Sequence, residues 1–158
     1  SALLAVAADM KDEAPLFHEV VLTAPDIDAD VFRRDIAPFL TRSARRVTLY
    51  ASSNDEALAL SKRLHGYARA GESGRQLVVV DGIDTIDVSN VDTSLVGHSY
   101  YGSNDTVLAD LFYVLTDPRP AAQRRWLEAV PLGQSVYWVF QREAARLRAA
   151  AGAATAPR

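Results

Sequence analysis

Hydrophobic residues gather in short, nearly continuous runs that alternate with longer stretches of mixed polarity. The runs at 19–24 and 47–51 are short and almost wholly apolar, which is typical of strands buried on both faces of a sheet. A third apolar region, 77–88, is interrupted by Asp81-Gly82, a pair that fits either a hairpin turn or a kink in one long strand. The pattern predicts a sheet of three to four strands.

The stretches between and after these runs have compositions or apolar spacings that favour helices. The predicted helices are 1–12, 31–40, 56–65, 106–115, 121–130 and 137–151. Strands that alternate with helices indicate the α/β class, with a mostly parallel sheet flanked by helices. We find no internal repeat or compositional break, so we predict one domain over 1–151, followed by a flexible tail at 152–158.

Composition removes several classes of function. The chain has 20 acidic and 17 basic residues, so no basic excess points to a nucleic-acid partner. Cysteine is absent, which excludes disulfides, a thiolate nucleophile and cysteine-based metal sites. No glycine-rich phosphate loop occurs, and we predict no cofactor and no metal. The apolar runs are too short to span a bilayer. The sequence does not distinguish a cytoplasmic location from a periplasmic one.

Two residues stand where catalytic groups are found in α/β proteins, in loops beyond the carboxyl ends of strands. Asp55 follows the run at 47–51, and His98 lies in the polar segment after the run ending at 88. An acid followed by a histidine is the order in α/β hydrolases, where the carboxylate orients the imidazole and stabilises its protonated form. From the pattern alone, a helix N-cap is the favoured role for Asp55 and a surface position the favoured one for His98.

Other polar residues have simpler explanations. Asp26, Asp28 and Asp30 alternate like calcium ligands, but the glycine and distal glutamate of a calcium loop are missing. Capping of the next helix is the favoured role, with Asp26 or Asp28 as a substitute triad acid the alternative. Tyr100 and Tyr101 could line a substrate cleft, although packing over His98 is favoured.

Residues 22–28, 47–55, 84–89 and 91–101 resemble a largely uncharacterised bacterial family of the α/β-hydrolase superfamily that is described as esterase/lipase-like. The resemblance runs from about residue 3 to residue 115. It implies a serine-hydrolase fold with Asp55 as the triad acid, His98 as the triad base and a small ester as substrate. Family members resemble other α/β hydrolases in carrying a Gly-x-Ser-x-Gly nucleophile elbow upstream, and this chain has none.

The nearest approach to an elbow is centred on Ser99. Its segment has Tyr101 where the tight turn requires a small residue, so we do not expect Ser99 to be the nucleophile. We expect instead that the chain is the C-terminal portion of a hydrolase, beginning in the helix after the missing serine. By itself it should then be inactive. The alternative is a non-catalytic oligomerisation or interaction module on a truncated scaffold, suggested by the missing elbow and the apolar stretch 136–140.

The resemblance also suggests a homodimer. In the resembled fold the strand at 20–24 is internal, so a chain without the upstream strands would expose its backbone donors and acceptors. Pairing across a two-fold axis would satisfy them. A C-terminal segment that folds back over this edge would leave a monomer instead.

Overall fold

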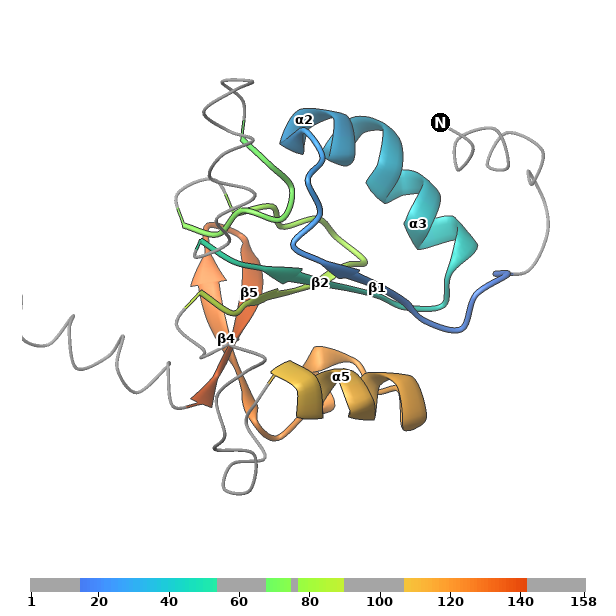
Figure 1. Cartoon of the computed structure of the whole chain (residues 1–158), viewed down its shortest axis with the longest axis vertical. Coiled ribbons are helices and arrows are strands. Elements are labelled where there is room, and N and C mark those ends of the chain that lie inside the picture. The colour runs from blue at the N-terminus through green and yellow to red at the C-terminus, as the bar shows by residue number, and fades with distance from the viewer. Residues whose placement is uncertain (1–14, 54–67, 75–76, 90–106, 142–158) are drawn as a thin grey trace, which may run out of the picture.

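The computed structural model describes residues 15–53, 68–74, 77–89 and 107–141. These residues form a five-stranded sheet with the order β1-β2-β3-β5-β4 (Figure 1). The strands are β1 (Val20–Thr23), β2 (Val47–Ala51), β3 (Asp84–Asp87), β4 (Leu127–Leu132) and β5 (Ser135–Phe140). All neighbours are parallel except β4 and β5. The predicted α/β class and mostly parallel sheet are confirmed, whereas the helices predicted at 1–12 and 56–65 lie outside the described residues.

Helices cover both faces of the sheet, giving three layers (Figure 1). One continuous helical segment consists of α2 (Ala29–Val31), a π-helical turn (Phe32–Ile36) and α3 (Ala37–Ser43), and it covers one face. The opposite face is covered by α5 (Val107–Thr116). No helix in the described part of the chain is long and apolar enough to cross a membrane.

The core is divided by β2, an interior strand of the sheet, all of whose residues are buried. Leu49 packs with Phe32 and Leu40 on the α3 side, while Tyr50 packs with Ile86 on the α5 side. The alternation follows from the pleat, which sends successive side chains to opposite faces. Burial on both faces favours apolar side chains, which explains the nearly continuous apolar run at 47–51, where Thr48 is the exception.

The C-terminal part differs from the prediction. Helices were expected at 121–130 and 137–151, but the structure has a short 3-10 turn (Ala121–Gln123) and then the β4–β5 hairpin. Two features favour the hairpin: Gly133 has φ +63° at the first position of a two-residue turn, and β5 is rich in β-branched and aromatic residues. The helix prediction was wrong over 121–130 and 137–140, whereas 142–151 lie outside the described residues. The hairpin brings the sheet to five strands.

The Asp81-Gly82 pair forms a turn that leads into β3. Gly82 has φ +83°, and the Ile83 N–H donates to the carbonyl of Val80 at 3.1 Å. Residues 77–80 are not a strand, so the region is neither of the two arrangements expected from the sequence. The segment is nevertheless held close to the sheet, because the Thr85 hydroxyl donates to the carbonyl of Val78 at 2.8 Å.

Candidate functional site

The parallel strands β1, β2 and β3 end at one common edge of the sheet. Ala51 at the end of β2 is in register with Asp87 at the end of β3, and neighbouring strands lie about 4.8 Å apart. The segments that carry Asp55 and His98 therefore leave the sheet from adjacent strand ends. Asp55 and His98 themselves lie outside the described residues, as do Ser99, Tyr100 and Tyr101.

A chain of hydrogen bonds links these two strand ends. The Ser53 N–H donates to Ser89 Oγ at 2.9 Å. The Ser89 hydroxyl donates in turn to Asp87 Oδ1 at 2.6 Å, and the Ser89 N–H donates to the same oxygen at 2.9 Å. Short distances are expected where the acceptor is a carboxylate. The post-β2 and post-β3 segments are thus fixed to each other through the Ser89 side chain.

The same carboxylate acts on a tyrosine of the neighbouring strand β5. Burial, and after it the negative charge of Asp87, raises the pKa of Tyr137. The Tyr137 phenol therefore keeps its proton to higher pH than an ordinary tyrosine does, and while protonated it can donate a hydrogen bond. Sequence reasoning gave Asp87, Ser89 and Tyr137 no role in the site. The β2–β3 register, which brings Ser53 and Ser89 together, cannot be predicted from the local sequence around either serine.

A third segment, 68–74, is hydrogen-bonded to the residues that directly follow β1 and β2. The Gly71 N–H donates to the carbonyl of Pro25 at 3.0 Å, and the Ser52 N–H donates to the carbonyl of Gly71 at 2.8 Å. A Cβ at position 71 would lie 2.3 Å from the carbonyl carbon of Ala24, so only glycine fits. Ala24 itself has φ +41°, a left-handed conformation that costs a non-glycine residue about 1–2 kcal/mol.

The three aspartates after β1 have structural partners. Asp28 caps α2, since its Oδ1 accepts from the backbone N–H groups of Asp30 and Val31 at 2.9 and 3.0 Å. Asp26 pairs with Arg69 at 3.1 Å, and Asp30 pairs with Arg33 at 3.2 Å. The capping interpretation of Asp28 is confirmed. No group of three or more potential metal ligands occurs among the residues that the structure describes.

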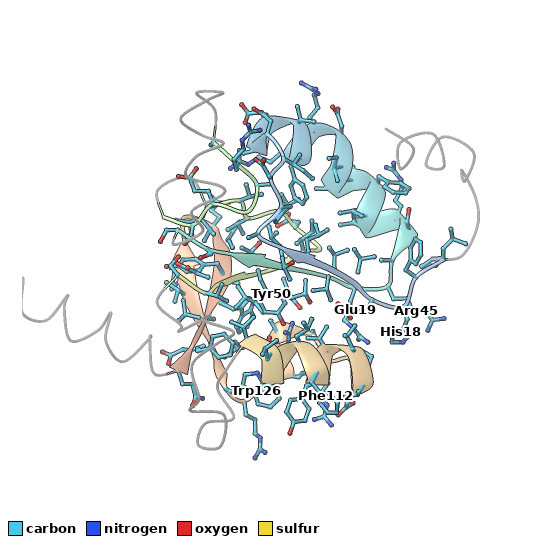
Figure 2. All side chains as sticks on the ribbon, in the orientation of Figure 1. His18, Glu19, Arg45, Tyr50, Phe112 and Trp126 are labelled. Atoms are coloured by element: carbon cyan, nitrogen blue, oxygen red, sulfur yellow. The ribbon has the colours of Figure 1, made fainter. Side chains whose placement is uncertain are left out.

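A second polar cluster lies on the α5 side of the sheet, where Figure 2 shows two of its members, Tyr50 and Trp126. Asp110 is fully buried and accepts from the Tyr50 hydroxyl at 2.6 Å, Arg124 Nη1 at 2.9 Å and Trp126 Nε1 at 2.6 Å. Burial, and then the Asp110 charge, raises the pKa of Tyr50 well above its usual range. Each Asp110 oxygen has a donor, so this cluster anchors α5 to β2 and to the start of β4.

The family comparison agrees with this geometry. Residues 2–115 match the model of the family described as "Alpha/beta hydrolase of unknown function (DUF900)". The matched region includes β1, β2, β3 and both segments that leave the carboxyl edge, while the β4–β5 hairpin follows it. No curated protein and no solved structure matches the chain. Since the match covers well over half of the 158 residues, the chain belongs to this family of alpha/beta hydrolases of unknown function (DUF900).

Proposed function

We propose that this chain supplies the acid and the base of a serine hydrolase that acts on small carboxylic esters. Asp55 is the acid and His98 the base in this proposal. The observation that supports it best is the linkage of the β2 and β3 ends through Ser53 and Ser89, because Ser53 stands two residues before Asp55 in the chain and Ser89 nine residues before His98. Membership of an alpha/beta-hydrolase family agrees with the same chemistry.

The proposed reaction is acyl transfer. A serine hydroxyl attacks the ester carbonyl carbon while His98 takes its proton, and the proton then passes to the departing alcohol oxygen. Water, deprotonated by His98, hydrolyses the acyl-serine and restores the free hydroxyl. Asp55 orients the imidazole and stabilises its protonated form.

The nucleophile of this proposal comes from outside the chain. The sequence contains no Gly-x-Ser-x-Gly motif, so the chain would be the C-terminal portion of the hydrolase. Without the nucleophile and the oxyanion donors, the isolated chain should hydrolyse p-nitrophenyl acetate no faster than background, since each such donor contributes about 10²–10³ in rate. Covalent labelling of Ser99 by a fluorophosphonate would contradict this.

The triad roles are tested in the longer protein that carries the serine. Asp55→Asn and His98→Ala should each lower kcat for p-nitrophenyl acetate about 10⁴-fold. Asp28→Asn is the matched control, because Asp28 caps a helix and should leave the activity of the folded protein unchanged. Wild-type rates in both Asp55→Asn and His98→Ala would refute the assignment.

A non-catalytic interaction module remains the second candidate. The stretch 136–140, which suggested it, forms most of β5, whose backbone is paired on both sides, and Val136 in it is 46% exposed. Exposed apolar residues on α5 favour the idea too. β1 is an edge strand in the described part of the sheet, which agrees with the dimer proposed on sequence grounds. Light scattering that gives twice the chain's 17.2 kDa would support a homodimer.

A further inference from the structure

The outer face of α5 is apolar and uncharged. Leu108, Phe112 and Leu115 are 42%, 62% and 63% exposed, and Tyr113 beside them is 39% exposed. The first three follow one another at spacings of four and three residues, so they form one stripe along the helix. Figure 2 shows Phe112 on the side of α5 away from the sheet. Asp110 is the helix's only charged residue, and it is buried on the inner side.

The stripe is held in place before any partner binds. Val114 on the inner side is buried, and Leu111 packs into the core with Tyr50. The Asp110 hydrogen bonds to Tyr50, Arg124 and Trp126 add a polar anchor. A partner would therefore meet a helix that is already ordered, which lowers the entropic cost of association.

The size of the surface suits the centre of a protein interface. Large apolar side chains each present about 150–250 Å² when fully accessible, so the exposed fractions of these four residues amount to about 400 Å². A stable interface buries about 800 Å² on each partner. The stripe and Tyr113 together account for about half of that area, and the rest would come from a polar rim.

The chemistry of the stripe identifies its partner. An uncharged helix face can lie against its own copy without like-charge repulsion, whereas a charged partner would find no complementary group on it. A membrane-surface helix would carry lysine or arginine on its polar side, and α5 has neither. The exposed Asp117–Arg119 ion pair just beyond the helix offers both signs of charge for a rim.

We propose that two copies of this chain associate through α5, with the stripe of Leu108, Phe112 and Leu115 packed against the same stripe of the partner about a two-fold axis. Such an isologous contact places each residue of the stripe against the same surface in the second copy. The proposal deepens the dimer proposed above and is independent of the triad assignment, because none of these residues lies at the carboxyl edge. It places the dimer interface at α5 instead of at the β1 edge that the sequence suggested.

The first test introduces a charge. Phe112→Asp should raise the dissociation constant of the dimer by at least about 30-fold in sedimentation equilibrium, the effect expected of an interface hot spot. Leu132→Asp is the matched control, since Leu132 is 46% exposed on β4 and should leave the constant unchanged. Far-UV circular dichroism checks that both variants fold. A wild-type mass of 17.2 kDa at high micromolar concentration would overturn the proposal.

The second test uses the absence of cysteine from the chain. Single cysteines are introduced by Phe112→Cys, Thr23→Cys and Arg33→Cys, and each variant is oxidised under the same conditions. Phe112→Cys should give a covalent dimer, while Arg33→Cys, on the opposite helical layer, should stay monomeric. A dimer from Thr23→Cys alone would place the interface at β1 and refute the α5 contact. A monomer that sediments with anionic phospholipid vesicles would refute it too.

Discussion

Replacing Asp110 by asparagine should destabilise the protein strongly, because the change removes a negative charge from a buried cluster of donors. One Asp110 oxygen accepts from Tyr50 and Arg124, and the other accepts from Trp126. An amide has only one accepting oxygen. In its better orientation that oxygen faces Tyr50 and Arg124, and the amide nitrogen then points its hydrogens at the N–H of Trp126.

The larger part of the loss comes from Arg124, whose side chain is only 2% exposed. Its remaining carboxylate neighbour, Asp84, is 3.6 Å from Arg124 Nη2, which is too long for a good hydrogen bond. Removing one partner of a buried ion pair costs about 3–5 kcal/mol. With Trp126 also left without its acceptor, we expect a loss of about 4 kcal/mol or more, a large share of the ~5–15 kcal/mol by which domains are stable.

Urea unfolding followed by tryptophan fluorescence measures this loss. With a denaturant slope of about 2 kcal/mol per molar, the midpoint should fall by about 2 M. Asp117→Asn is the matched control, because the Asp117–Arg119 pair is more than half exposed and such pairs contribute about 1 kcal/mol or less.

A milder variant keeps the prediction testable if Asp110→Asn does not fold. Tyr50→Phe removes one donor and should cost about 1.5–3 kcal/mol, the usual contribution of a hydrogen bond to a charged group. If Asp110→Asn and Tyr50→Phe both shift the midpoint no more than Asp117→Asn does, the cluster is not an anchor and the reasoning fails.

Three further predictions concern the edge and the core. Gly71→Ala should lower the free energy of unfolding by about 1–3 kcal/mol in urea titration, because the added Cβ would clash with the Ala24 backbone. Gly133→Asn is the control and should change the free energy of unfolding little, because position 133 has open space and asparagine tolerates a left-handed φ. Ser89→Ala leaves the Ser53 N–H without this acceptor and should cost about 1–3 kcal/mol in thermal unfolding, and an unchanged midpoint would contradict the link. The raised pKa of Tyr50 means that the folded state keeps a proton that the unfolded chain loses, so stability should fall as pH rises above about 10. Tyr50→Phe should flatten that fall in unfolding measurements across this pH range.

Local pattern was enough to predict the N-terminal strands and α5. A strand covered by helices favours apolar residues, and the mostly apolar runs at 19–24 and 47–51 show this preference in the sequence. β3 is the exception, because Asp84, Thr85 and Asp87 make it largely polar. The hairpin was missed because alanine, leucine and arginine around it favour helix locally. Its signal was a glycine at the first turn position, followed by the β-branched and aromatic stretch of β5. Pairing of β5 with both β3 and β4 outweighs the local helix propensity.

Only the positions of the candidate site residues relative to the strands could be predicted from the sequence. Asp55 and His98 follow two strand-like runs, and parallel pairing then brings those strand ends to one edge. The link through Ser53, Ser89 and Asp87 depends on register, which is set by pairing across the sheet rather than by neighbours in sequence. The burial of Asp110 was equally unreadable, since Tyr50 and Arg124 are far from it along the chain.

The two kinds of strand pairing in this sheet have different consequences for how the protein folds. The β4–β5 hairpin closes through a two-residue turn and needs only contacts between near neighbours in sequence, so it can form within microseconds. The β3–β5 pairing joins Ile86 to Trp138 and must first close a long loop. The hairpin should therefore be ordered early and act as the template on which β3, and then β2 and β1, assemble. Substitutions in the hairpin turn should slow folding, whereas substitutions in β1 should mainly speed unfolding.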